Sequence, residues 1–278
     1  MSGTAFAIVA AAALLHALWN AMVKASGDRA VTLGMIALGH LILGGIAACF
    51  LPWPGWQTAP YIAASTIIHW GYYWLIYHAY RLGDLSLVYP ISRGVAPVLV
   101  TLGAMTAVGE TLSAMGWAGV LAVSAGVMLL AMGEVRRGVS GAAAGLALLL
   151  GLVIAAYSLT DGTGARVSDS VAGYIAWLFV CEGIAAAWLL AIRFRRLRGL
   201  GPRPWALGIA GGIASAVAYG LAIWAKTIAP FGLVSALRET SVVIAAGIGM
   251  VWFGERPWRP RLLAALVVAG GAAAIALA

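Results

Sequence analysis

Residues 93–110 read RGVAPVLVTLGAMTAVGE, and residues 238–255 read RETSVVIAAGIGMVWFGE. At a shift of 145 positions (238 − 93) both stretches begin with arginine, share a valine and a methionine, and end with a Gly-Glu pair. The same shift pairs further residues downstream: Leu121 with Leu266, Val123 with Val268, and Gly126 with Gly271. Two arginines inside apolar runs and two Gly-Glu pairs in one register indicate an internal duplication, so we expect one fold used twice.

The composition around these stretches is that of a membrane protein. Of the 278 residues, 63% are hydrophobic and 9% are charged, against about 25% charged residues in soluble domains. A helix needs about 20 mostly apolar residues to cross a bilayer, and ten such stretches occur. They lie at roughly 4–23, 31–50, 60–80, 85–108, 112–132, 140–160, 171–192, 205–226, 231–253 and 259–277. We therefore predict an all-α polytopic membrane protein with one integral membrane domain, built as two five-helix repeats, 1–137 and 138–278, around a central cavity.

The positive charges predict the orientation of the chain. The loops after odd-numbered spans hold most of them, including Arg136, Arg137 and four arginines in 193–198, whereas the loops after even-numbered spans hold only Arg166 and Lys226. The positive-inside rule then puts both termini outside the cytoplasm. Because each repeat has five spans, the second copy enters the membrane from the opposite side, which is the inverted repeat of many secondary transporters that work by alternating access.

Polar residues within the spans are the candidate site residues, because a charge at the bilayer centre costs about 2.5–3.5 kcal/mol on insertion scales. His16 and Asn20 in the first span repeat the four-residue spacing of Tyr157 and Asp161 in the sixth, which puts each pair on one helix face. The charged candidates in other spans are Arg93, Glu182, Arg238 and Glu239.

Arginine suits a carboxylate through bidentate hydrogen bonds, and an acidic side chain suits an amino group. These residue types predict a binding site for a zwitterion or another small polar solute. The alternative is an internal ion-pair network, Arg238 with Glu182 for example, that only holds the helices together.

Aromatic residues are dense in the third span, where Trp74 and Tyr77 lie near mid-depth, and the eighth span offers Tyr219 and Trp224. Such rings can contact an apolar side chain or a cation. Trp and Tyr also gather at membrane interfaces without any substrate, so an anchoring role stays open.

Other features are interpreted as structural. Each Gly-Glu pair permits a turn and puts a carboxylate at the N-terminus of the next helix. His40 is expected to be a hydrogen-bonded packing residue, and Gly208 with Gly212 and Gly141 with Gly145 permit close helix contact. Neither an enzyme motif nor metal-ligand spacing occurs, so we expect no catalytic residues, no cofactor and no metal.

Several motifs together resemble the EamA-type members of the drug/metabolite transporter superfamily. They are His16-Ala-Leu-Trp-Asn20-Ala-Met-Val-Lys24, Tyr80-Arg-Leu-Gly-Asp-Leu-Ser-Leu-Val-Tyr-Pro90, Tyr157-Ser-Leu-Thr-Asp161-Gly, Leu237-Arg-Glu-Thr-Ser241 and the two Gly-Glu turns. Tyr89, within the second motif, joins the substrate-binding candidates.

The resemblance implies ten helices from a duplicated five-helix unit, with a cavity lined mainly by the first, third, fourth, sixth, eighth and ninth. It also implies export from the bacterial cytoplasm across the inner membrane, with amino acids a prominent substrate class, as in the aromatic amino-acid exporter branch. Many relatives keep both termini in the cytoplasm, which is opposite to the orientation that the charges predict here.

The resulting hypothesis is a secondary or facilitative exporter of neutral or aromatic amino acids. Arg238 or Arg93 would orient the carboxylate, and Glu239 or Asp161 the amine. Its partners would be a small-molecule substrate and the lipid bilayer, without nucleic acid or an obligate protein partner. The alternatives are an exporter of another metabolite or of a drug-like cation, a channel, and a membrane scaffold or enzyme.

Overall fold

The computed structural model describes residues 1–25, 29–82, 85–132, 140–192, 199, 201–253 and 258–278, and within these ranges the chain is helical without any strand. The helices are α1 (Gly3–Ala25), α2 (Arg29–Phe50), α3 (Ala59–Leu82), α4 (Leu85–Ala107), α5 (Ala114–Leu129), α7 (Gly141–Arg166), α8 (Val171–Ile192), α10 (Pro202–Ile228), α11 (Phe231–Arg238), α12 (Thr240–Phe253) and α13 (Trp258–Leu277), with a short 3₁₀ turn, η1 (Trp56–Thr58), before α3. The predicted boundary between the repeats, 137/138, and the pair Gly254-Glu255 lie outside the described residues.

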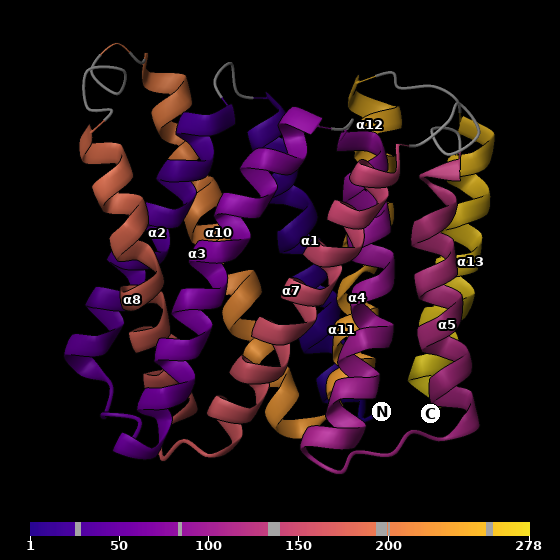
Figure 1. Ribbon diagram of the computed structural model, residues 1–278, viewed down its shortest axis with the longest axis horizontal. Coiled ribbons are helices and arrows are strands. Elements are labelled where there is room, and N and C mark those ends of the chain that lie inside the picture. Colours follow the sequence, from indigo (N-terminus) through magenta and orange to yellow (C-terminus); the bar gives the residue numbers. More distant parts are fainter. Residues whose placement is uncertain (26–28, 83–84, 133–139, 193–198, 200, 254–257) are drawn as a thin grey trace.

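The long helices stand side by side as one bundle, and both ends of the chain lie at the same end of it (Figure 1). Within the described ranges, seven helical stretches are long and apolar enough to cross a membrane, and Gly34–Phe50 and Ala114–Leu129 are shorter apolar helices. A helix satisfies its backbone N–H and C=O groups internally, and this is required in a bilayer because hydrocarbon offers no hydrogen-bond partners. The structure is therefore that of an all-α membrane protein.

Many large apolar side chains face outward, while several charged side chains within the helices are buried. On α10 the exposed face carries a stripe of large apolar residues: Ile209, Ile213, Val217, Trp224 and Ile228. The opposite face buries Ser215, Tyr219 and Lys226. Buried charges also occur on α4, α7 and α8, in Arg93, Asp161 and Glu182. This distribution matches lipid, not water, as the surrounding solvent.

Glycines allow α2 and α10 to touch backbone to backbone. A Cβ at Gly39 would lie 2.7 Å from the Cα of Gly212, and one at Gly208 would lie 2.6 Å from the Met35 side chain. The predicted Gly208/Gly212 contact is thus confirmed. Gly141 and Gly145 have nothing within 4 Å of a Cβ built on them, so this pair makes no such contact.

The expected span 231–253 is interrupted after Arg238 by a single tight turn, at which the backbone of Glu239 stays close to helical (φ −69°, ψ −11°). Glu239 lies between α11 and α12, where its N–H donates to the carbonyl of Ala236 (3.0 Å) instead of that of Ser235, the residue before it, as an α-helix would require. The Thr240 hydroxyl also donates to the carbonyl of Leu237 (2.7 Å) at this turn. The break puts an arginine, a carboxylate and a helix C-terminus at one place within an apolar span.

Candidate functional site

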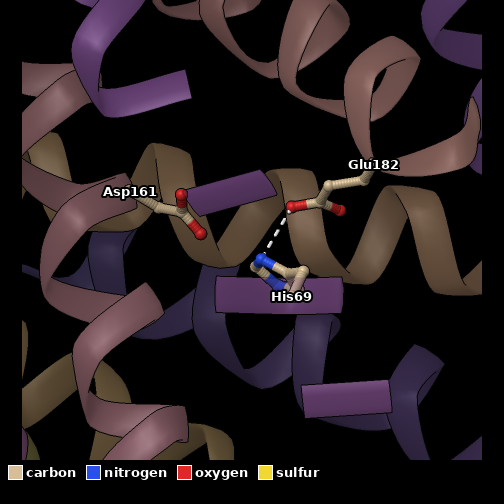
Figure 2. A group of neighbouring side chains, drawn as sticks. All are labelled: His69, Asp161 and Glu182. Carbon is tan, nitrogen blue, oxygen red and sulfur yellow. Dashed lines mark ion pairs between the residues drawn. The ribbon is translucent and has the colours of Figure 1, made fainter. Parts of the chain in front are cut away.

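Three polar side chains from three helices meet inside the bundle. His69 of α3, Asp161 of α7 and Glu182 of α8 are all buried, and Figure 2 shows them converging. The Nδ1 of His69 lies 3.0 Å from Glu182 Oε1. The same ring nitrogen lies 2.9 Å from the carbonyl of Ser65, one turn earlier on α3. We call these three side chains the acidic cluster.

Tyrosines surround the acidic cluster. The Tyr219 hydroxyl donates to Asp161 Oδ2 and lies 3.5 Å from His69 Nε2. The Tyr174 hydroxyl donates to Asp161 Oδ1 over 3.5 Å. The Tyr157 ring packs on the His69 ring with 4.3 Å between centroids. Asp161 is therefore held by two phenols, and no lysine or arginine of the described residues pairs with it.

A second buried group centres on Arg93 of α4. Its Nε lies 2.8 Å from Glu239 Oε2, at the break between α11 and α12. A terminal guanidinium nitrogen lies 3.4 Å from His16 Nε2 on α1, and the Tyr89 ring lies 5.8 Å from the guanidinium carbon. These contacts join α1, α4 and the broken span.

Arg238 lies between the two groups. Its guanidinium carbon is 5.2 Å from the centroid of the Tyr219 ring, whose hydroxyl reaches the acidic cluster. Arg238 is only partly buried, and no acceptor from the described residues hydrogen-bonds or ion-pairs with it. The predicted alternative, an Arg238–Glu182 ion pair, is absent between these two described residues because Glu182 lies against His69. Arg238 thus retains guanidinium donors for another acceptor.

The bundle is tied together at the end that carries the termini. Arg166, at the end of α7, donates to Glu110 Oε1 (2.6 Å) and to the carbonyls of Lys226 (2.8 Å) and Ala229 (3.1 Å), and stacks on Phe231 at 4.0 Å. The other Glu110 oxygen accepts from the backbone N–H of Phe231 over 2.8 Å. We call these contacts the Arg166 latch.

The latch corrects the interpretation of the first Gly-Glu pair. Gly109 does adopt a positive φ of 68°, as a glycine turn requires. Glu110, however, meets the N-terminus of α11 and not that of the next helix, α5. The α5 N-terminus is capped by Ser113, whose side chain accepts from the N–H of Gly116 (3.1 Å).

Lys226 was predicted in a loop, but it is a buried residue of α10. Its ammonium donates to the carbonyl of Ser158 (2.7 Å) and to the Ser158 hydroxyl (2.6 Å) on α7. The sequence did contain a signal for this, because Lys226 follows Tyr219 by seven residues, two helical turns on the same face.

The structure brings most predicted site residues into these groups. Those brought together are His16, Tyr89, Arg93, Tyr157, Asp161, Glu182, Tyr219, Arg238 and Glu239. Asn20 instead donates to the carbonyl of His16 on its own helix (2.7 Å). His69 was not predicted as a site residue. His40 contacts the Ser215 hydroxyl (3.1 Å), as expected of a hydrogen-bonded packing residue.

Two predicted tryptophans are not near the buried groups. Trp224 is 46% exposed on the apolar stripe of α10, and Trp74 on α3 is 62% exposed. Five residues separate Tyr219 from Trp224, which turns the two side chains about 140° apart around the helix. The expectation that both indoles face the site is not met in this structure. The side chain of Tyr77 lies outside the described part of the chain.

Comparison with known proteins identifies a fold and no function. No family model and no curated protein matches the chain. A solved crystal structure, described only as "Crystal structure of protein", resembles it with a TM-score of 0.77 at 20% sequence identity, covering 100% of this chain and 98% of that chain. At this identity the likeness shows a shared fold alone.

Proposed function

We propose that the protein is a membrane carrier that moves small metabolites with a carboxylate, namely neutral or aromatic amino acids, by alternating access. One observation carries the proposal: Arg238 lies at the broken span, against Tyr219, without a protein acceptor among the described residues. A structural arginine inside a membrane protein is expected to be paired. An unpaired one at a helix break is suited to an anionic group that comes and goes.

Helix packing supports the proposed ten spans in two inverted repeats. We pair α1 with α7, α2 with α8, α3 with α10, α4 with the broken span α11–α12, and α5 with α13. If each helix is replaced by its partner, the α1–α10 contact becomes the α7–α3 contact, and the α1–α12 contact becomes the α7–α4 contact. All four of these contacts occur in the structure. The α2–α8 contact and the α5–α13 contact each join the two members of one pair, so the exchange leaves them unchanged. These two contacts lie at opposite edges of the bundle (Figure 1).

The substrate would be held by opposite charges at the break. Its carboxylate would accept from Arg238, and its ammonium would lie near Glu239. Arg93 keeps Glu239 in place through the 2.8 Å ion pair. The rings of Tyr157 and Tyr219, 6.1 Å apart between centroids, offer an apolar side chain an aromatic neighbour.

The same proposal includes the cellular setting. We place the chain among EamA-type exporters of the bacterial inner membrane, on the motifs that resemble theirs. Both termini would lie outside the cytoplasm, on the charge distribution. Both termini lie at the same end of the bundle, as an even number of membrane crossings requires.

Counterflow in proteoliposomes tests the carrier. Vesicles that contain the purified chain are loaded with an unlabelled amino acid, and uptake of the labelled one is measured for wild type, Arg238→Gln and Arg259→Gln. Arg259 is an exposed arginine at the start of α13 and is the matched control. We expect wild-type and Arg259→Gln counterflow at similar rates, and loss in Arg238→Gln. Absence of counterflow for every amino acid in folded wild-type protein contradicts the substrate class.

A further inference from the structure

The carboxylates of the acidic cluster lack the counter-ions that buried acids usually have. Asp161 and Glu182 are 0% and 3% exposed, and neither forms an ion pair with a lysine or arginine of the described chain. A buried charge without a compensating partner is strongly unfavourable. His69 is the one cationic side chain that could neutralise them within the cluster, and it lies against Glu182 alone.

The hydrogen bonds of His69 leave one carboxylate oxygen without a donor. The Nδ1–H of His69 is directed at the Ser65 carbonyl, 2.9 Å away. Glu182 Oε1 lies 3.0 Å from the same nitrogen, outside hydrogen-bond geometry, and this buried atom has no other donor among the described residues. A buried oxygen without a well-aligned donor, in a cluster of ligand-type side chains, leaves a cation as a candidate partner.

The spacing fits a metal ion after a small contraction. One ligand atom from each of His69, Asp161 and Glu182 lies within 4.8 Å of the other two. Metal–nitrogen and metal–oxygen bonds of about 2.0–2.2 Å put three ligand atoms of one ion roughly 3.3–3.8 Å apart at angles of about 109–120°. Side-chain shifts of about 1 Å therefore bring the three ligand atoms around one ion.

The surroundings resemble the outer shell of known metal sites. A ligating histidine usually donates its other ring N–H to a carbonyl, as His69 does to Ser65. Nε2, which lies 3.5 Å from the Tyr219 hydroxyl, is then the ring nitrogen left to bind metal, and the Glu182 carboxylate, now 3.0 Å from Nδ1, has to turn toward it. Asp161 is oriented by the hydroxyls of Tyr174 and Tyr219, as ligating carboxylates are by outer-shell donors.

We propose that His69, Asp161 and Glu182 bind one divalent transition-metal ion, joining α3 to α7 and α8. One imidazole with two carboxylates suits ions of the Mn²⁺ to Zn²⁺ range, whereas Mg²⁺ and Ca²⁺ prefer oxygen alone. This site goes beyond the proposed carrier function, because binding is measured without any transport. The ligands are buried, so an ion enters when the helices part and titrations need long equilibration.

The test is a Co²⁺ titration of the full-length chain in detergent, freed of metal by chelator dialysis and followed by visible absorption. We expect one Co²⁺ per chain, displaced by Zn²⁺ and not by Mg²⁺. His69→Gln, Asp161→Asn and Glu182→Gln should each weaken binding by at least about tenfold, the loss that even outer-shell changes cause. His40→Gln and Asp169→Asn are the matched controls, a histidine outside the cluster and an exposed aspartate, and should bind as wild type does.

A spectroscopic measurement on wild type keeps the proposal testable if a variant does not fold. Pulsed electron paramagnetic resonance of bound Mn²⁺ should show coupling to an imidazole nitrogen. No saturable Co²⁺ or Mn²⁺ binding by wild type overturns the site. Binding that persists in all three folded cluster variants, or that shows no nitrogen coupling, overturns it equally. Metal binding with failed counterflow would retain this site and remove the proposed substrate class.

Discussion

Replacing Arg166 by alanine should lower the stability of the bundle through loss of the latch. Arg166 makes three hydrogen bonds, at 2.6, 2.8 and 3.1 Å, to Glu110, Lys226 and Ala229. A hydrogen bond to a charged group contributes about 1.5–3 kcal/mol when buried. Because 30% of the Arg166 side chain is exposed, solvent screening reduces the total, and we expect a loss of about 2–4 kcal/mol.

A loss of that size is visible in a melting curve. At roughly 2–3 °C per kcal/mol for a chain of this length, Arg166→Ala should lower the Tm by about 5–10 °C. The assay is the fraction of monodisperse protein that remains after heating in detergent, measured by size exclusion. Arg166→Lys should recover less than half of the loss, because an ammonium cannot reproduce the planar fork of the guanidinium.

Two comparisons decide whether the reasoning about the latch holds. Arg259→Ala removes an exposed arginine and should change the Tm by less than about 1 °C. In a double-mutant cycle, Glu110→Gln and Arg166→Ala should couple by about 1–2 kcal/mol, since the two side chains share one contact. A Tm for Arg166→Ala within 1 °C of wild type, or an equal fall in Arg259→Ala, would refute it.

Three further predictions concern the helix contacts, the buried ion pair and the orientation. Gly39→Ala forces a Cβ against the Gly212 backbone and should lower the stability of the bundle by about 1–3 kcal/mol. Gly71→Ala, where the Cβ meets open space, should not destabilise it. Equal melting curves for the two variants would contradict the helix contact. Arg93→Met or Glu239→Gln alone leaves a buried charge unpaired and should cost about 3–5 kcal/mol of stability. The double variant should recover part of this loss. Additive losses in a thermal melt would argue against the ion pair. Alkaline phosphatase fused to either terminus should be active in bacteria, because both termini are predicted to lie outside the cytoplasm. Activity of a cytoplasmic reporter fused to the termini would reverse the predicted orientation.

The sequence predicts the all-α membrane class because the apolar runs are long and few charges interrupt them. It also selects most members of the two buried groups, since a charge such as Arg93 inside a span needs a polar environment wherever the helix lies. Which of these residues pair with one another cannot be predicted from the sequence in the same way. The Arg93–Glu239 ion pair forms at the turn after Arg238, where Thr240 donates to the Leu237 carbonyl, and apolar periodicity contains no sign of this local arrangement.

Side-chain direction explains the other differences. Trp224 was grouped with Tyr219 by membership of one span, yet a five-residue separation turns it to the outer face. His69 was hidden in a run of aromatic residues that reads equally as an interface anchor. Lys226 looked like a loop residue because positive charges usually end a span, and only its place on the Tyr219 face of α10 indicates burial.

The most direct test of the central claim is whether residue 238 recognises a carboxylate. Proteoliposome counterflow of an amino acid is compared with that of its carboxamide, which keeps the ammonium and side chain and lacks the negative charge. Wild type should prefer the acid by about tenfold or more, as a lost charge-assisted bidentate contact implies, and Arg238→Gln should lose that preference. An equal preference for the acid in wild type and in folded Arg238→Gln would contradict the assignment of Arg238 to the substrate.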